Sequence, residues 1–336
     1  MDGITDHPFR HITKKYGHPD IVYTEFTSVE GVCHGASQLL KDFLFDEIQR
    51  PAIAQIYGTT PKFFRQTTTI LCELGFDGID INMGCPAKNV AHSGAGAALI
   101  LTPKLAQEII SETRAGITDW VNGKRSRDCS DISEEVWQEV ERRHDLLPIS
   151  FQERKHLPVS VKTRIGYDKP VIEEWIPYLL EKEPAAIALH GRTLKQQYGG
   201  RADWDAIGTA ARLIHETSTL ILGNGDIQSL SDAQEKIQTY GTDGALLGRC
   251  TMGNPFVFLR DGSQQNIFSL AIEHAQLYED TFVHSEKYTF LPMRKHLGWY
   301  VRDIPNASQI RQEIYRCNTT SEFAAVLQKY GLNMIY

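Results

Sequence analysis

The stretch 77-DGIDINMGCPAKNV-90 decides how this chain folds, because it begins as a strand and stops abruptly at Gly84-Cys85-Pro86. Gly84 permits an unusual turn, and Pro86 removes one backbone donor, so the strand is not expected to continue past this point. The Cys85 thiol is therefore expected to project from the tip of the strand. What lies around that tip depends on the neighbouring strands.

Short β-rich runs recur along the chain, and each is followed by a stretch with helical spacing. Most are separated by roughly 25 to 35 residues, the size of one βα unit in a parallel barrel. The pattern predicts an α/β chain with a TIM (β/α)8 barrel. The opening, residues 1–17, has the pattern of a strand end, a loop and a helix, so we expect the first of eight strands to be very short or to begin upstream of Met1. The visible runs are DIVYTEF (20–26), PAIAQIYG (51–58), GIDINMG (78–84), LPVSVKTRIG (157–166), AAIALHGRT (185–193), TLILGNGDI (219–227) and DGALLGRC (243–250).

Helix signals lie between these runs. In TPKFFRQTTTILCELG, Thr60 is expected to cap the helix, Pro61 to occupy its first turn and Gly75 to end it. The segment TPKLAQEIISETRAG repeats the same order of signals, which predicts a second helix from residue 102 to about 116.

Two departures from the βα rhythm define the predicted domains. An insertion from about 117 to 155 contains the helix pattern DISEEVWQEVERR, with Ile132, Val136 and Val140 on one side. Because it precedes a strand, we expect it at the bottom of the barrel, away from the catalytic face. The periodicity becomes helical after residue 266, so we predict a barrel over 1–262 and a helical bundle over 266–336.

Composition excludes several classes of protein. The chain has 336 residues, 41% apolar content and a net charge of −7, so any nucleic-acid partner must meet a local basic face. It contains no apolar run long enough for a membrane span and no signal-peptide pattern. Its six cysteines form no C-x-x-C pair, which argues against a metal site or a disulfide framework. We expect a cytoplasmic protein, monomeric and without metal.

Polar residues gather at the carboxyl ends of the predicted strands, which face one mouth in a parallel barrel. This placement makes them candidates for a functional site. They are Gln55, Asn82, Cys85, Lys162, Arg164, His190, Arg192, Asn224, Asp226 and Arg249.

Glycines follow the last two predicted strands, in LGNGDI and LGRC. Glycine lets backbone N–H groups approach a phosphate closely, and barrels place phosphate sites after strands seven and eight. Tight turns that need a positive φ explain either glycine motif alone equally well. Together, the two motifs favour a cofactor or substrate that carries phosphate.

Three of the polar residues each allow two interpretations. An inward-facing Lys162 either meets an anion, such as the N1–C2=O edge of a reduced flavin, or forms a structural ion pair with an acid such as Asp80. His190 is either a site residue or a buried histidine with its hydrogen bonds satisfied. Cys85 suits a proton donor or a nucleophile because a free thiol is mostly protonated at neutral pH; the alternative is a small buried hydrophobic residue.

The pieces resemble one family closely, the flavin-dependent tRNA-dihydrouridine synthases. The resemblance covers nearly the whole chain outside the predicted insertion, in the order of the family's motifs. The matching segments include MDGITDHPFR, GIDINMGCPAKNV, VSVKTRIG, ALHGRTLKQQYGGRADWD, GRCTMGNPFVF and RKHLGWY.

The resemblance implies a barrel that binds FMN, a helical tRNA-binding domain, and reduction of a tRNA uridine with NADPH. It implies that hydride passes to uracil C6 and that Cys85 protonates C5. The implied flavin contacts are Met1, Gln55, Lys162 and His190, with Asn224, Gly225, Asp226, Gly248 and Arg249 at its phosphate and ribityl chain. The implied substrate residues are Asn82 and Arg164 at the uracil, with Gln196 and Tyr198 at the RNA entrance.

The helical tail offers a basic face for RNA. Residues 287–316 hold six basic residues, among them Lys287, and two acids, one of which is Asp303. On a helix, Arg294, Lys295 and Arg302 are expected within about 100° of one another, and Met293, Leu297, Tyr300 and Val301 on another side. A solvated basic face without RNA explains the same pattern.

Two other functions stay open at the level of sequence. One is a flavin barrel that reduces a free pyrimidine, which the long helical tail disfavours. The other is an RNA-binding module whose barrel has lost its flavin. The sequence does not identify which tRNA uridine is modified.

Overall fold

The computed structural model describes residues 1–260, 266–285, 288–302 and 304–332. The chain divides into two compact units. The sheet unit comprises Ile21–Leu44 and Arg50–Leu247, and the helical unit comprises Met1–Asp20, Phe45–Gln49 and Gly248–Tyr336.

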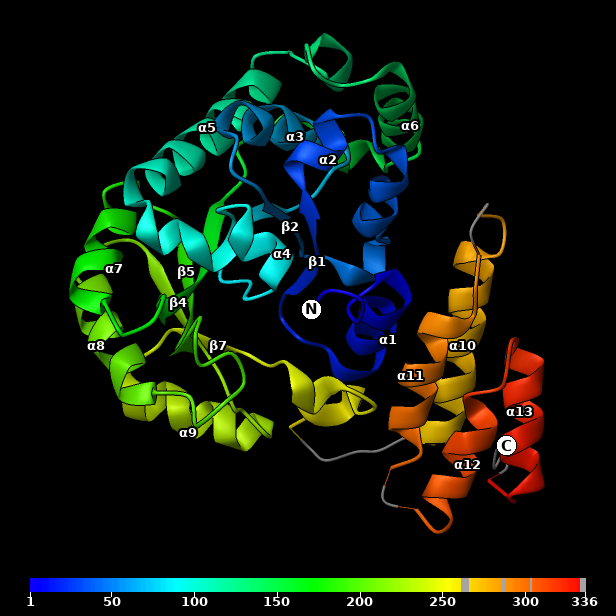
Figure 1. The fold of residues 1–336 in the computed structure, drawn as a ribbon. Coiled ribbons are helices and arrows are strands. Elements are labelled where there is room, and N and C mark those ends of the chain that lie inside the picture. Colours follow the sequence, from blue (N-terminus) through cyan, green and yellow to red (C-terminus); the bar gives the residue numbers. More distant parts are fainter. Residues whose placement is uncertain (261–265, 286–287, 303, 333–336) are drawn as a thin grey trace. The chain divides into compact units, whose positions relative to one another are not determined.

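The sheet unit is built on seven parallel strands that pair in chain order from β1 to β7 (Figure 1). Each of the seven predicted strands is confirmed, and the curled sheet with helices around it confirms a TIM-like barrel fold. Within the described residues 1–21 there is no strand, so an eighth strand is not observed there. The strands are β1 (Val22–Ser28), β2 (Ala52–Tyr57), β3 (Gly78–Met83), β4 (Val159–Gly166), β5 (Ala186–Thr193), β6 (Leu220–Asn224) and β7 (Gly244–Leu246).

Helices and short 3₁₀ turns connect these strands. Every residue of β3 is buried, as expected for a parallel strand covered on both faces. The helices of this unit are α2 (Val29–Cys33), α3 (Pro61–Glu73), α4 (Lys88–His92), α5 (Pro103–Val121), α6 (Glu134–His144), α7 (Ile172–Leu180), α8 (Trp204–Ile214) and α9 (Leu230–Tyr240). The 3₁₀ turns are η1 (Ser37–Phe43), η3 (Gly96–Leu101), η4 (Ser126–Asp128) and η5 (Ile149–Phe151).

The start of α3 corrects one prediction. Thr60 is the residue before the helix, but its side chain makes no capping hydrogen bond. The Glu30 carboxylate instead accepts hydrogen bonds from the backbone N–H groups of Thr59 at 2.7 Å and Thr60 at 3.1 Å. A carboxylate is favoured there by the exposed N–H groups and dipole of the helix N-terminus.

The end of α5 corrects a second prediction. The helix continues through Gly116 to Val121 instead of ending near 116. A Cβ on Gly116 would lie 2.2 Å from the Arg65 carbonyl oxygen of α3. This glycine therefore permits close packing of two helices and does not terminate one.

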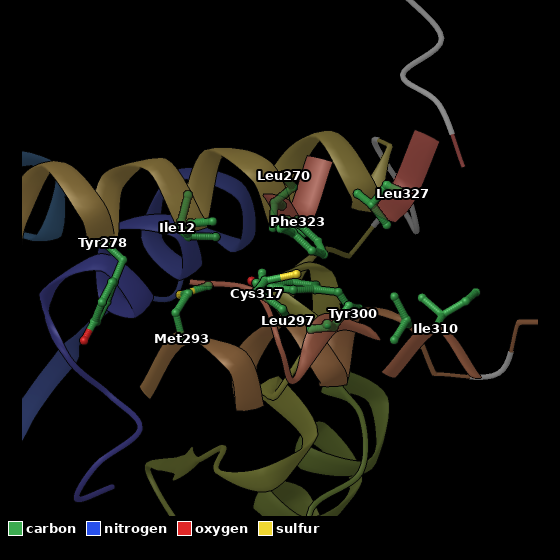
Figure 2. Packing of buried hydrophobic residues seen from close by; sticks show 14 of the residues in the cluster. Ile12, Leu270, Tyr278, Met293, Leu297, Tyr300, Ile310, Cys317, Phe323 and Leu327 are labelled. Atoms are coloured by element: carbon green, nitrogen blue, oxygen red, sulfur yellow. The ribbon is translucent and has the colours of Figure 1, made fainter. Parts of the chain in front are cut away.

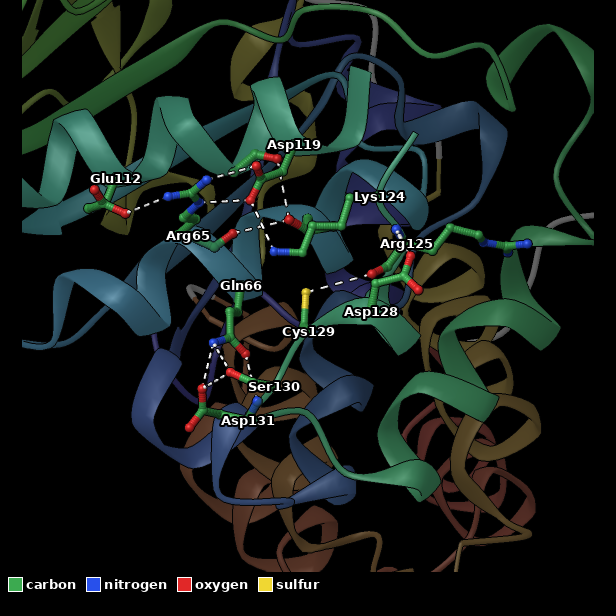
Figure 3. A network of polar contacts seen from close by, with 12 residues as sticks. Arg65, Gln66, Glu112, Asp119, Lys124, Arg125, Asp128, Cys129, Ser130 and Asp131 are labelled. Atoms are coloured by element: carbon green, nitrogen blue, oxygen red, sulfur yellow. Dashed lines mark hydrogen bonds and ion pairs between the residues drawn. The ribbon is translucent and has the colours of Figure 1, made fainter. Parts of the chain in front are cut away.

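The predicted insertion, 117–155, is tied to α3 and α5 by polar contacts (Figure 3). Asp119 accepts hydrogen bonds from Arg65, and Gln66 donates to Asp131 at 2.6 Å. The predicted helix is confirmed as α6, with Val136 and Val140 fully buried.

Further along, this segment packs against the loops that precede β2 and β3. The Arg50 guanidinium lies 3.5 Å from the Phe151 ring centroid, and a Cβ on Gly75 would meet Leu147 at 2.7 Å. These contacts are at the amino ends of the strands, where the sequence predicted the segment.

The helical unit has its own apolar core (Figure 2). The core joins Ile12 of α1 to Leu297, Ile310, Phe323 and other buried residues of the carboxyl-terminal helices. The predicted boundary between 1–262 and 266–336 therefore differs from the observed division, because α1 packs with the tail. The helices are α1 (His7–Gly17), α10 (Ile267–Phe282), α11 (Leu291–Tyr300), α12 (Ala307–Ile314) and α13 (Thr320–Lys329), with the 3₁₀ turns η2 (Glu47–Gln49), η6 (Arg249–Thr251) and η7 (Pro255–Phe258).

Candidate active site

The carboxyl ends of β2 to β6 bring five predicted site residues into a staggered row that crosses these strands at successive levels of the sheet. Asn82 of β3 is in register with Lys162 of β4, and His190 of β5 is in register with Asn224 of β6. Gln55 of β2 joins the row through a hydrogen bond from Asn82. Parallel strands of one sheet place equivalent positions side by side, so residues far apart in sequence face one mouth.

A buried chain of hydrogen bonds leads from Asp80 to the Cys85 turn. Gln55 Nε2 donates to Asp80 Oδ2 at 2.7 Å, and Asn82 Nδ2 donates to Gln55 Oε1 at 3.1 Å. Asn82 Oδ1 then accepts from the N–H groups of Gly84 at 3.0 Å and Cys85 at 2.9 Å. The sequence considered Asp80 only as an ion-pair partner, because strand register was needed to place Gln55 beside it.

Cys85 is 8% exposed and belongs to a small apolar cluster with Val90 and Ala95. Phe26 and Tyr57 pack against this cluster. The thiol is thus held near the strand tip in a largely apolar cluster.

Lys162 keeps its charge in spite of burial. Burial and the nearby Arg164 lower the pKa of Lys162 to about 8, while Asp80 and Cys85 oppose the shift. Its Nζ donates to Asn224 Oδ1 at 3.2 Å, and among the described residues it forms no ion pair with a carboxylate. The alternative of a structural ion pair between Lys162 and Asp80 is therefore not observed.

His190 is neutral over the physiological range. Burial lowers its pKa to about 2, and the charges of Lys162, Arg164 and Arg192 contribute. Its Nε2 lies 3.5 Å from Arg192 Nη1. A neutral imidazole beside three cations is suited to hydrogen bonding and not to carrying charge.

The turn after β6 is shaped by two successive residues with positive φ, Gly225 at 130° and Asp226 at 53°. A Cβ on Gly225 would lie 2.6 Å from Cβ of Ala202 and 3.1 Å from Cδ2 of His190. Asp226 accepts hydrogen bonds from Arg192 at 2.7 Å and from the Ala202 N–H at 2.8 Å. The glycine therefore brings backbone close to His190, and the aspartate fixes the turn.

Arg164 connects the Cys85 turn to the loop after β5. Its Nε donates to Gly84 O at 2.7 Å and its Nη1 donates to Thr193 O at 3.0 Å. In that loop, Gln196 Oε1 accepts from the Thr193 N–H at 2.8 Å, and Tyr198 is 69% exposed. The loop from Lys195 to Gly200 is exposed, with Tyr198 at its surface, and the hydrogen bond of Gln196 holds the loop's shape.

A hollow of ≈ 300 Å³ opens beside the Cys85 cluster, and sequence reasoning did not identify it. Tyr57, Val90 and Ala95 belong both to its lining and to the Cys85 cluster. The strand ends and the turn after the cysteine could have suggested it, because both converge on one mouth. Its lining residues are Ser28, Glu30, Tyr57, Gly58, Thr59, Asn89, Val90, Ser93 and Ala95.

Three predicted cofactor residues lie in the helical unit. Met1 and Gly248 are close, since a Cβ on Gly248 would lie 3.7 Å from the Met1 sulfur. Arg249 begins η6 directly after Gly248. The structure thus brings these three together within that unit.

The predicted basic face on α11 needs a correction. The helix ends at Tyr300, so Arg302 is not on the same helix as Arg294 and Lys295. Arg294 donates to Cys317 O and to Asn318 Oδ1, each at 2.7 Å, and Lys295 donates to Gly3 O. The opposite side is confirmed, because Met293, Leu297, Tyr300 and Val301 are all buried. Lys287 and Asp303, which the sequence counted in this region, lie outside the described residues.

The described part of the chain contains no helix that combines the length and apolarity needed to cross a membrane. It also contains no group of three or more His, Cys, Asp or Glu side chains arranged to hold a metal ion. All six cysteines are free thiols.

Comparisons with known proteins agree on one family. The family described as "Dihydrouridine synthase (Dus)" matches residues 1–142 and 150–334. Most of the segment 117–155 therefore lies inside the family pattern, and the gap between the matched ranges is confined to residues 143–149.

The similar curated proteins are bacterial. A "Probable tRNA-dihydrouridine synthase" of Staphylococcus aureus (strain COL) is 32% identical over 342 aligned residues, covering 99% of this chain and 92% of the relative. The "Probable tRNA-dihydrouridine synthase 2" of Bacillus subtilis (strain 168) is 31% identical over 338 aligned residues, covering 98% and 92%.

The comparison with solved structures is weak. It gives DHODH in complex with ferulenol from Eimeria tenella, with a TM-score of 0.43 and 12% identity over 82% of this chain and 64% of that one. The family match and the curated relatives each span nearly the whole chain, and on that evidence the chain belongs to the dihydrouridine synthase family.

Proposed function

We propose that this protein reduces a uridine of tRNA to 5,6-dihydrouridine, with FMN as cofactor and NADPH as reductant. The observation that carries the proposal is the pairing of the Cys85 turn with Lys162 on adjacent strands, in a chain of this family. A thiol that can donate a proton and a half-buried cation at one strand-end mouth are what a hydride and proton addition requires.

The residues of the row fit a flavin. Lys162 is a half-buried cation whose described hydrogen-bond partner is a neutral amide, so an anionic ring edge would supply the missing countercharge. The neutral His190 and the Cβ-free Gly225 lie side by side, which leaves room for a ligand to approach the backbone. We propose Gln55, Lys162, His190, Asn224, Gly225 and Asp226 as flavin contacts in the sheet unit, whereas Met1, Gly248 and Arg249 of the helical unit remain predictions from the resemblance to the family.

We propose Cys85 as the proton donor. Reduced FMN would supply the hydride that adds to C6 of the uracil. The Cys85 S–H bond breaks as a C–H bond forms at C5, and the thiolate that remains is stabilised by the positive charges of Lys162 and Arg164. Asn82 and Arg164 fix the turn that carries the thiol and are placed to orient the uracil.

We propose tRNA as the substrate because the similar proteins are named for it and because the helical unit offers cations. Arg302 is exposed beside Trp299, with its guanidinium 5.9 Å from the ring centroid, an arrangement suited to a phosphate or a base. Arg294 and Lys295 are proposed as further RNA contacts, and Gln196 and Tyr198 as the entrance. The target base must leave its stack to reach a strand-end mouth.

The test offers the purified protein, supplied with FMN and NADPH, two substrates: a tRNA transcript without modifications, and free uridine 5′-monophosphate. We expect nucleoside mass spectrometry to detect dihydrouridine in the tRNA, with little product from the mononucleotide. Reduction of the mononucleotide alone would favour the free-pyrimidine enzyme. Failure to retain FMN or to reduce either substrate would reject the proposal.

A further inference from the structure

Asp80 is fully buried two residues before Asn82 on β3, and the proposed chemistry does not use it directly. It is in register with Gln55 on β2 and with Ser160 on β4. Ser160 Oγ donates to Oδ1 at 2.6 Å, and Gln55 Nε2 donates to Oδ2 at 2.7 Å. Each carboxyl oxygen thus accepts one hydrogen bond from a neighbouring strand.

The hydrogen bond from Gln55 determines how that amide is turned. With its NH₂ group facing Asp80, its oxygen faces Asn82 and accepts from Asn82 Nδ2 at 3.1 Å. The Asn82 oxygen is then left to face the N–H groups of Gly84 and Cys85. A side-chain amide has two N–H donors on one side and an oxygen acceptor on the other. Turning the amide of Gln55 or Asn82 around would therefore place two donors or two acceptors against each other in this series of hydrogen bonds.

We propose that Asp80 is a positioning residue whose carboxyl group sets the orientation of Gln55 and Asn82 and, through them, the Gly84–Cys85 turn. This inference rests on the proposed role of Cys85 as the proton donor. Three side chains in series, each 6% exposed or less, transmit the orientation from the buried carboxyl to the thiol. Errors of about 1 Å in a reacting group can lower a rate by as much as roughly 100-fold, so a group that fixes the turn affects the rate without touching the substrate.

The other groups that face Asp80 have different roles. Burial raises the pKa of Asp80 to about 6, and the charge of Lys162 on β4 opposes that shift. Burial also raises the pKa of Tyr23 on β1, and the charge of Asp80 adds to that rise. Neither forms the link to the turn. The Gln55–Asn82 link is made of hydrogen bonds alone, so an oxygen acceptor at position 80 is sufficient to maintain it.

The experiment compares Asp80→Asn with Asp80→Ala in the FMN-loaded protein. Asparagine keeps an oxygen for Gln55, whereas alanine removes it. The first measurement is the rate at which iodoacetamide alkylates Cys85, quantified by peptide mass spectrometry, and the second is kcat and KM for tRNA.

For D80A we expect alkylation to rise about tenfold and kcat to fall roughly 10- to 100-fold, with KM for tRNA within about threefold of the wild type. D80N should remain within about threefold of the wild type in its alkylation rate, its kcat and its KM for tRNA. Ser160→Ala, which keeps the bond to Gln55, is the matched control and should leave the alkylation rate unchanged. Wild-type alkylation and kcat in D80A, or D80N as impaired as D80A, would overturn the proposal.

A double-mutant cycle tests whether Asp80 acts through Asn82. If it does, D80A combined with Asn82→Ala should be no slower than N82A alone. A double variant whose rate falls by the product of the two single reductions would overturn the proposal. If D80A does not fold, Gln55→Leu breaks the same chain one residue later, and an unchanged alkylation rate there would overturn it.

Alkylation of Cys85 needs no turnover, so it tests the positioning role of Asp80 separately from the proposed reduction of tRNA. A protein that fails to reduce tRNA but shows the expected alkylation order rejects the proposed function and supports the positioning of Cys85 by Asp80. A protein that reduces tRNA but shows equal alkylation in all variants rejects only the positioning role.

Discussion

Lys162 is the residue on which the electrostatics of the site depend. A lysine in water carries its charge far above neutral pH, but burial lowers the pKa of this one to about 8. Its charge therefore changes in a range where an enzyme can be assayed. An anionic partner bound beside it would raise the pKa again.

The first prediction concerns the pH dependence of flavin reduction by NADPH. Because Lys162 is charged below its pKa and neutral above it, the rate should fall as pH rises through about 8 or somewhat higher. Lys162→Arg should remove this alkaline limb, since arginine stays protonated, and Lys162→Met should be slow at every pH. Stopped-flow absorbance checks this, with exposed Lys104→Met as control. An alkaline limb that persists in K162R would exclude Lys162 as the titrating group.

At this scale the sequence predicted which polar residues gather at the strand ends. Gln55, Asn82, Lys162, His190 and Asn224 were predicted because each lies near the end of a recognisable strand. The partner of each side chain could not be predicted, since it depends on strand register. Asp80 illustrates this, because only the pairing of β2 with β3 shows that it holds Gln55 and not Lys162.

At the scale of elements, α3, α5 and α6 are joined by buried polar groups. Glu73, the last residue of α3, is fully buried and accepts from Arg125 Nε at 2.6 Å and from the Ser126 N–H at 2.7 Å. The sequence correctly predicted α6 by its periodicity. It did not predict that α5 continues past Gly116, because a glycine that permits close packing and one that ends a helix look alike in sequence.

The second prediction follows from Glu73. Glu73→Ala leaves Arg125 without its buried partner, which should lower the free energy of unfolding by about 3 to 5 kcal/mol. Urea titration measures this change. The control is Arg142→Ala, which breaks the ion pair of Arg142 with Glu139. Because the Arg142 side chain is 60% exposed, this change should lower the free energy of unfolding by less than about 1 kcal/mol. Equal losses of unfolding free energy in E73A and R142A would contradict the claim that Glu73 is a buried, stabilising partner of Arg125.

The third prediction concerns the histidines His274 of α10 and His296 of α11. Both are buried, their rings are 5.2 Å apart, and neither Nε2 has a partner among the described residues. Burial lowers the pKa of His274 to about 3 and that of His296 well below 6.5. Below pH 6.5 the unfolded chain binds protons that the native helices do not, so stability is lost as pH falls through 6.5.

Each of these histidines should contribute a slope of about 1.4 kcal/mol per pH unit between roughly pH 6 and pH 4. His296→Leu should therefore make the fall in stability shallower by that amount in urea titrations at several pH values. His284→Leu, at an exposed position, should leave the slope unchanged. A slope in H296L equal to that of the wild type would show that His296 is charged in the native state.

At the scale of the whole molecule, the chain combines a parallel sheet unit with a helical unit that takes in both termini. The sequence predicted both folds, because strand and helix periodicities are local. It placed the boundary near residue 262, whereas α1 joins the carboxyl-terminal helices through residues such as Ile12. Packing between segments more than 250 residues apart has no local signal in a single sequence.

The most direct test of the central claim is a single turnover with tRNA in the FMN-loaded Cys85→Ala protein. NADPH should reduce its flavin at the wild-type rate, whereas dihydrouridine should form at least about 100-fold more slowly, because the proton donor to C5 is missing. Cys72→Ala, which removes a buried thiol of α3, is the matched control and should form dihydrouridine normally. Formation of dihydrouridine at the wild-type rate in C85A would contradict the assignment of Cys85 as the acid.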